Sequence, residues 1–251
     1  MNNKTEAGFK PESFKWLASK EDLSWWFRSR NKIILWAMRK FSSNPKSLLE
    51  IGCGTGYVLD AINKAFPSST LHGDECFEEG LRFAKQRVPH ASFRCLDALK
   101  MVDRDCYDVI GAFDVIEHIK DDKIVLQNCF LALKSKGHLF LTVPQHMWLW
   151  SHVDEDACHI RRYSKSEIIE KVQGSGFKVL ASTSFNSFLI PLMFLSRKNF
   201  FRKNSISRSE LNISSWLNFI FESIMKIEIF LIQLGIRLPF GGSLILVAQK
   251  P

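Results

Sequence analysis

The sequence predicts an α/β protein built on a largely parallel sheet, and three observations lead to this expectation. Its 251 residues, 46% of them hydrophobic and 24% charged, suffice for one large buried core. Between residues 47 and 143, short apolar segments alternate with helical segments of about 10–15 residues, which is typical of βαβ units. A glycine-rich turn, Gly52–Gly56, follows the first apolar segment, at the edge where parallel sheets bind ligands.

Residues 1–46 precede this alternation, and we expect them to form a helical lid. Residues 1–12 have the composition of a loose tail. Apolar side chains then recur at helical intervals from Ser13 to Phe41, and Asn44-Pro45 ends the segment. Charged residues interrupt the first thirty positions, so we expect no secretory signal there.

The core is predicted in two pieces, residues 47–186 and 241–251. Its predicted strands are Ser47–Ile51, Ser69–Gly73, Ala91–Cys95, Asp108–Phe113, His138–Val143, Phe177–Phe185 and Ser243–Gln249. Its predicted helices are Tyr57–Phe66, Glu78–Arg87, Asp122–Leu133 and Ser164–Gly174. Strands joined through helices imply parallel pairing with right-handed crossovers.

Residues 187–240 form a predicted helical insertion, or cap, between the last two strands. Phe188–Leu195 is too short to span a bilayer, and charged residues interrupt Trp216–Leu234. We therefore expect an amphipathic helix with a wide apolar arc. Together with the basic segment Arg197–Lys203, it makes residues 197–234 a candidate for peripheral membrane contact. The alternative is a cap helix that packs over the active site.

The net charge of +8 is unevenly distributed: residues 1–47 carry +6, residues 48–160 carry −6 and residues 161–251 carry +8. Such basic ends suit an anionic partner, either a phosphorylated substrate, a membrane surface or RNA, although solvated helical faces would have the same composition. The six cysteines contain no C-x-x-C pair. They are expected to be reduced thiols in a cytoplasmic protein.

The glycine turn itself indicates a ligand. Glycines permit positive φ and close backbone approach, and the following helix offers unpaired N–H groups. A dinucleotide fingerprint would need a third glycine at position 57, which is Tyr57. Two acidic residues accompany the turn. Glu75 lies where a carboxylate reaches ribose hydroxyls, with Asp74 as the competing choice. Asp97 lies where a carboxylate accepts a hydrogen bond from an adenine amine, beside Ala98.

These residues resemble the class I S-adenosylmethionine-dependent methyltransferases, in the small-molecule branch with an E-x-G-x-G-x-G turn. The segment Gly111–Ile119 is similar to that family's D-V-x-E-H segment. The resemblance implies a Rossmann-like, seven-stranded sheet of order 3-2-1-4-5-7-6 and S-adenosylmethionine as cofactor. It implies that the cofactor-binding residues are Glu50, Gly52, Cys53, Gly54, Gly56, Glu75, Asp97, Ala98 and Phe113.

The acceptor should lie beyond the carboxyl ends of the fourth and fifth strands, because open α/β sheets bind ligands there. A loop rich in histidines and aromatic residues follows the fifth strand. Four side chains are candidates for the base that removes the acceptor's proton. They are His118, His146, His159 and Tyr163.

Asp114, Glu117 and His118 also resemble the E-x-x-E-H metal site of some O-methyltransferases, with His146 or His159 as a further ligand. Metal-free relatives share this segment, and no metal is assigned.

The sequence thus predicts methyl transfer to an oxygen or nitrogen of a small, apolar or lipid-linked acceptor. One alternative is an RNA methyltransferase that uses the basic flanks, although no RNA-binding motif is present and no nucleic acid is expected as partner. The other is a non-catalytic S-adenosylmethionine-binding adaptor at a membrane surface. The scaffold hosts many chemistries, so the acceptor itself is not specified.

Overall fold

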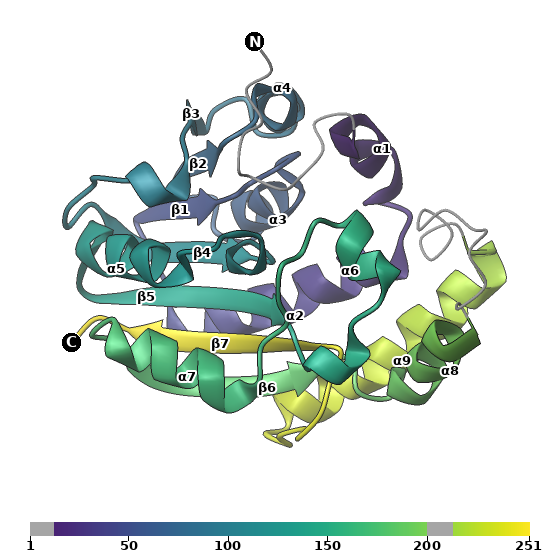
Figure 1. Cartoon of the computed structure of the whole chain (residues 1–251). Coiled ribbons are helices and arrows are strands. Elements are labelled where there is room, and N and C mark those ends of the chain that lie inside the picture. The colour runs from purple at the N-terminus through teal and green to yellow at the C-terminus, as the bar shows by residue number, and fades with distance from the viewer. Residues whose placement is uncertain (1–12, 200–212) are drawn as a thin grey trace, which may run out of the picture.

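The computed structural model describes residues 13–199 and 213–251, without the side chains of residues 196–199. A seven-stranded sheet of order β3-β2-β1-β4-β5-β7-β6 forms its centre (Figure 1). The strands are β1 Ser47–Ile51, β2 Thr70–Glu75, β3 Ser92–Cys95, β4 Tyr107–Phe113, β5 Leu133–Pro144, β6 Lys178–Phe185 and β7 Ser243–Gln249. β1 to β5 pair in parallel, and β7 lies antiparallel between β5 and β6. The predicted fold class and strand order are confirmed.

Helices cover both faces of the sheet. They are α1 Ser13–Lys20, α2 Trp25–Phe41, α3 Tyr57–Ala65, α4 Glu78–Arg87, α5 Asp122–Ala132, α6 His152–Asp156, α7 Lys165–Gly174, α8 Ile190–Asn199 and α9 Ser215–Gln233. Short 3₁₀ turns are η1 Ala98–Lys100, η2 Ile116–His118 and η3 Met147–Leu149.

Side chains that alternate along the strands build a separate apolar cluster on each face. Leu49 and Ile110 point to the face that α5 and α7 cover. Leu48 and Val109 point to the opposite face, which α2, α3 and α9 cover. The central strands are therefore buried on both sides, as the near-continuous apolar runs of parallel strands require.

Several predicted boundaries differ by one or two residues, and two are wrong by more than that. The helix expected from Ser13 to Phe41 is divided into α1 and α2 by a turn. The turn exists because Glu21, at its start, is buried against Thr55 of the glycine loop. β5 begins at Leu133 rather than His138, since β4 pairs Tyr107 with Leu133 and then Val109 with His138, which leaves the intervening residues as a bulge.

Residues 187–240 contain α8 and α9, and α9 covers the same face of the sheet as α2. α9 packs along α2, and Met225, Ile229 and Ile232 join the apolar cluster on that face. The division into lid, core and insertion stays a prediction, and the tail of residues 1–12 lies outside the described residues. In the described ranges, no helix is both long enough and apolar enough to cross a bilayer.

Candidate functional site

The loop between β1 and α3 is shaped by glycines in the left-handed region. Gly52 and Gly56 have φ angles of 64° and 76°. A Cβ atom on Gly52 would lie 2.6 Å from Val115 Cγ2, and one on Gly56 would lie 2.8 Å from the Cα atom of Ala84. Gly54, with φ of 53°, has an open side, because a Cβ there would find its nearest heavy atom at 3.8 Å. The loop is thus held tightly at both ends and is open in the middle.

Glu75 lies against this loop at the end of β2. Its carboxylate accepts hydrogen bonds from the backbone N–H groups of Gly54 at 3.0 Å and Phe77 at 3.1 Å. Burial raises the pKa of Glu75, and these hydrogen bonds oppose the rise. The competing residue, Asp74, is bound on both oxygens by Arg94, at 2.7 and 2.6 Å. Glu75 thus contacts the glycine loop, whereas Asp74 pairs with Arg94, and contact of Glu75 with a ligand stays a prediction.

Two buried ionisable side chains beside the loop have atoms without hydrogen-bond partners in the described residues. Glu50, at the end of β1, is 2% exposed, and its Oε2 has no hydrogen-bond partner among the described residues. Burial raises the pKa of Glu50 well above its usual value, and the charge of Arg30 opposes this. Arg30, from α2, donates from Nη1 to Asp114 at 2.5 Å, while its buried Nε has no partner in the same residues. An anionic and a cationic group of a ligand would satisfy both.

The other predicted cofactor residues have mixed surroundings. Asp97 accepts a hydrogen bond from the Leu99 N–H at 3.0 Å and caps η1, in which Ala98 is buried. Cys53 is buried within the glycine loop. The Phe113 ring covers Gly111 and belongs to the apolar cluster on the α2 face. Contact of Phe113 with a sulfonium stays a prediction.

α1 lies over the glycine loop. The Phe14 ring is close to both Gly54 and Gly80, where added Cβ atoms would lie 3.8 and 2.9 Å from Phe14 Cε1. Thr55 donates from its hydroxyl to both carboxylate oxygens of Glu21, at 2.8 and 2.6 Å. Arg87 pairs with the same carboxylate at 3.1 Å. Within the N-terminal segment, α1 therefore packs directly on the glycine loop.

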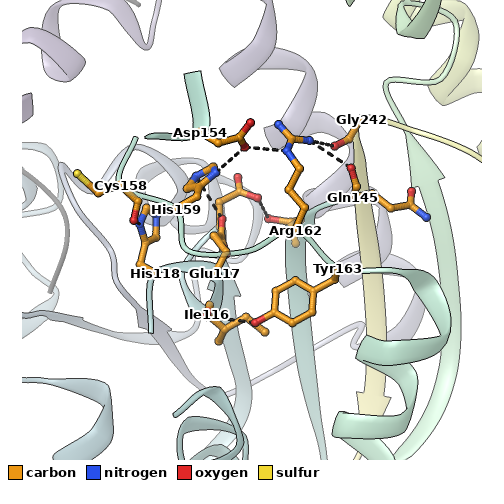
Figure 2. A network of polar contacts seen from close by, with 12 residues as sticks. Ile116, Glu117, His118, Gln145, Asp154, Cys158, His159, Arg162, Tyr163 and Gly242 are labelled. Carbon is orange, nitrogen blue, oxygen red and sulfur yellow. Dashed lines mark hydrogen bonds and ion pairs between the residues drawn. The ribbon is translucent and has the colours of Figure 1, made fainter. Parts of the chain in front are cut away.

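A second cluster of polar side chains lies beyond the ends of β4 and β5 (Figure 2). One ligand atom from each of Glu117, His118 and His159 falls within 4.8 Å of the others. Asp154 lies between His159 and Arg162 in Figure 2, and its Oδ1 accepts from His159 Nδ1 at 2.9 Å and from Arg162 Nε at 2.7 Å. His159 Nε2 is 3.8 Å from Glu117 Oε1.

Burial and neighbouring charges separate the pKa values in this cluster. Burial, with the charge of Asp114, raises the pKa of Glu117 well above its usual value. Burial, with the charge of His159, lowers the pKa of His118 to about 4. Burial would raise the pKa of Asp154, but the hydrogen bond with His159 and the charge of Arg162 keep it below its usual value. Asp154 is therefore ionised at neutral pH, and His118 is neutral.

Asp114 is not part of the ligand set that the structure assembles. Its φ of 58° is unusual for a residue other than glycine and turns the chain at the end of β4. One carboxylate oxygen accepts from Arg30, and the other accepts from the Thr142 hydroxyl at 3.1 Å. The combination of Asp114, Glu117 and His118 differs from the observed group of Glu117, His118 and His159.

The two remaining base candidates have different environments. The His146 ring stacks on Trp148 with centroids 5.2 Å apart, and burial followed by the charge of Arg162 lowers its pKa. Tyr163 is fully buried, and its hydroxyl donates to Asp122 Oδ2 at 2.7 Å. Burial and this carboxylate raise the pKa of Tyr163. The Tyr163 hydroxyl therefore links the end of the loop after β5 to the core.

Sequence reasoning predicted that Arg28 or Arg30 meets a carboxylate or phosphate, but it assigned no specific role to three residues of the site: Gln145, Asp154 and Arg162. Gln145 is 1% exposed, and neither of its amide atoms has a hydrogen-bond partner in the described part of the chain. The polar loop after β5 was recognised as a binding region, but its pairings are between residues distant in sequence. No periodicity or motif signals them.

Comparisons with known proteins bear on the family and the fold. A family model described as a methyltransferase domain matches residues 16–182. A malonyl-[acyl-carrier protein] O-methyltransferase of Bacillus anthracis is 32% identical over 107 residues, which are 41% of this chain and 40% of the relative. A ubiquinone biosynthesis O-methyltransferase of Bradyrhizobium diazoefficiens is 25% identical over 124 residues, 45% of this chain and 48% of the relative. The chain thus spans less than half the length of these relatives.

Solved structures with low identity share the fold. Haemonchus contortus phosphoethanolamine N-methyltransferase 2, in complex with S-adenosyl-L-methionine, has a TM-score of 0.63 at 18% identity, covering 98% of this chain and 57% of that chain. The N-methyltransferase NodS of Bradyrhizobium japonicum, in complex with S-adenosyl-L-homocysteine, has a TM-score of 0.60 at 14% identity, covering 96% and 97%.

Proposed function

The chain belongs to the methyltransferase domain family, and on this premise we propose that it is an S-adenosylmethionine-dependent methyltransferase acting on an oxygen or nitrogen of a small molecule. One observation carries the proposal. The glycine loop, with the unbonded Glu50 Oε2 and Arg30 Nε beside it, lies at the same edge of the sheet as the histidine cluster, and the ion pair of Arg30 with Asp114 joins the two. A donor and an acceptor bound there would be neighbours.

The loop has the chemistry that S-adenosylmethionine requires. The free Oε2 of Glu50 suits the ammonium group of the methionine portion, and the free Nε of Arg30 suits its carboxylate. We propose that Glu75 takes the ribose hydroxyls and that Asp97, with Ala98, takes the adenine. When bound, this cofactor supplies an electrophilic methyl group. The protein's task is then to align the acceptor and remove its proton.

We assign the proton acceptor to His159. Asp154 accepts from its Nδ1, which selects the tautomer whose Nε2 carries a lone pair. The ionised Asp154 would also stabilise the imidazolium that forms, as in other histidine–carboxylate pairs. The other three candidates are weaker: His118 has a pKa of about 4, His146 stacks on an aromatic ring, and the Tyr163 hydroxyl is buried against a carboxylate.

The test is the variant His159→Gln. We expect turnover to fall by about 10²–10⁴-fold, the usual contribution of a positioned base. Stabilisation against thermal unfolding by S-adenosylhomocysteine should persist, because His159 does not contact the glycine loop. His90→Gln, at an exposed histidine that bonds to Asn63, is the matched control. Full turnover of His159→Gln would contradict the base assignment, and a protein that never responds to S-adenosylhomocysteine would contradict the cofactor.

The acceptor is proposed to be apolar or lipid-linked. Its support is the exposed aromatic rim at His146, where Trp148 stacks and the Phe240 ring lies 6.2 Å away. Binding to RNA with a steep salt dependence would instead favour an RNA acceptor. All six cysteines are free thiols, which supports the cytoplasmic location that we propose.

Membrane contact through residues 197–234 also remains a proposal. The basic residues of that range up to residue 212 lack described side chains. The exposed apolar side chains of α9 support this membrane contact.

A further inference from the structure

The outward side of α9 carries an apolar stripe. Met225, Ile229 and Ile232 are buried against the sheet, as in an ordinary amphipathic helix. The opposite side of such a helix is normally polar. Here it consists of five large apolar side chains and Ser223. The five, which are between 57% and 69% exposed, are Trp216, Phe219, Ile227, Phe230 and Leu234. α9 therefore has apolar residues on both sides, and only one side is covered by the described chain.

A cationic groove runs beside this stripe, between α2 and α9. It has a volume of about 660 Å³. Four cations line it together with aromatic and aliphatic side chains, and no acidic residue does. The cations are Lys32, Arg39, Lys40 and Lys226. Phe230 lines the groove and also belongs to the stripe, so the two features are continuous.

The nearest carboxylate offsets only part of the groove's positive charge. Glu222 accepts from Arg28 at 2.6 Å and from Lys32 at 2.7 Å, whereas Lys226 is 3.8 Å away. Burial would raise the pKa of Glu222, but the hydrogen bonds from Arg28 and Lys32 lower it to about 2. Its single charge is thus used within the contact between α2 and α9. Lys40 lies over the Trp36 ring at 5.2 Å, and it forms no ion pair with a carboxylate of the described residues.

We propose that the α9 stripe and the α2–α9 groove form a docking surface for an anionic phospholipid membrane. The five apolar side chains would enter the boundary between headgroups and acyl chains, where tryptophan and phenylalanine bind well. The four cations would lie at the level of the phosphates. Helix α9 would lie in the plane of the membrane without crossing it.

The charges favour a membrane over a second copy of this chain. A two-fold symmetric dimer would place the same patch on both subunits and bring the four cations of each copy toward those of the other. Like charges in such an interface oppose association. An anionic bilayer complements both the apolar and the cationic parts of the surface.

The surface also continues toward the candidate acceptor site. The segment after α9 exposes Ile236 and Phe240, and the Phe240 ring lies beside His146. Docking would therefore bring the aromatic rim of the acceptor site close to the lipid. The docking surface does not depend on methyl transfer, and binding can be measured without turnover.

The experiment is co-sedimentation of the full chain with vesicles. One set contains phosphatidylcholine alone, and the other contains about one third phosphatidylglycerol. We expect binding to the anionic vesicles, weak binding to the neutral ones, and loss of binding as salt screens the cations.

A charge-reversal pair tests the groove. Each cation near an anionic surface contributes about fivefold in affinity, so Arg39→Glu with Lys40→Glu should weaken binding by at least about 25-fold. Arg82→Glu with Lys85→Glu is the matched control, because both residues are exposed on α4, far from α9 in Figure 1, and the charge change is identical. The control should bind like the parent chain.

An apolar pair tests the stripe. Phe219→Ser with Phe230→Ser should abolish most binding while leaving the folded core intact, because both side chains are exposed. Val102→Ser, at a side chain that is 78% exposed elsewhere, should have no effect.

Three results would overturn the proposal. They are no binding to either vesicle, equal binding to neutral and anionic vesicles, and a dimer in solution that the Phe219→Ser and Phe230→Ser pair dissociates. The last result would show that a second copy covers the stripe.

Discussion

The contact between Thr55 and Glu21 predicts that α1 opens when Thr55 is replaced by Val. The Thr55 hydroxyl lies 2.8 and 2.6 Å from the two Glu21 oxygens, and both residues are buried. Val has nearly the same shape as Thr and removes only this donor. The Glu21 carboxylate would remain buried with Arg87 as its main partner, at 3.1 Å.

The magnitude follows from the charge of Glu21. A hydrogen bond to a charged group contributes about 1.5–3 kcal/mol. If the bond exists only when α1 is closed, its loss raises the open population by about 10- to 150-fold. Because Arg87 still pairs with Glu21, we expect the lower part of this range.

Amide hydrogen exchange of Ser13–Lys20 measures the opening directly. Thr55→Val should accelerate exchange in α1 about tenfold or more and leave β1 and β4 protected. The control is Ser19→Ala, because the Ser19 hydroxyl bonds to the Trp16 carbonyl on the exposed side of the same helix. If exchange in α1 is unchanged in Thr55→Val, or rises equally in Ser19→Ala, the contact between Thr55 and Glu21 is not what keeps α1 closed. A uniform rise across the sheet would mean global destabilisation instead.

Three further predictions concern the histidine cluster and the helices on the sheet. His118 has a pKa of 6.5 when unfolded and about 4 when folded, so the unfolded chain binds more protons between these values, and stability falls as pH drops through this window. His118→Asn should remove this loss of stability, which amounts to about 3 kcal/mol by pH 4. Urea titrations at several pH values measure it, and an unchanged dependence of the unfolding free energy on pH would contradict the low pKa of His118. Glu222→Gln should lower the free energy of unfolding by about 1.5–3 kcal/mol, because it weakens the hydrogen bonds from Arg28 and Lys32. Tm should fall by about 2–4 °C for each kcal/mol. Glu170→Gln, at an exposed residue, should leave Tm unchanged. Turnover should persist in EDTA if His159 acts directly as the base, and activity lost to EDTA but restored by a divalent cation would reassign Glu117, His118 and His159 as metal ligands.

Local patterns predicted the frame of the fold because their causes are local. The alternation of short apolar segments with helical segments located the core strands, and Glu78–Arg87 and Ser243–Gln249 were predicted with the observed bounds. Pro89 prevents α4 from continuing past Val88, so the end of this helix is encoded within a few residues. The glycine turn was recognisable because positive φ at Gly52, Gly54 and Gly56 requires that residue type.

The predictions failed where distant contacts override local preference. The periodicity continues from Ser13 to Phe41, but the chain turns at Glu21, whose carboxylate is buried against Thr55, a contact that the local sequence does not signal. β5 starts early because pairing with Tyr107 extends it past a bulge that resembles a helix end in the sequence. An apolar arc on α9 was expected, but which side covers the sheet depends on α2.

By itself, the sequence determined the fold class, the strand order through a family resemblance, and the glycine loop. It did so because strand and helix periods, turns and glycine positions are properties of neighbouring residues. Only the tertiary structure decided which charged groups meet. Arg30 and Asp114 are 84 positions apart, and Arg28 and Glu222 are 194 apart. Such pairs form because the chain brings them to one edge or one face of the sheet, where burial makes each charge require a partner.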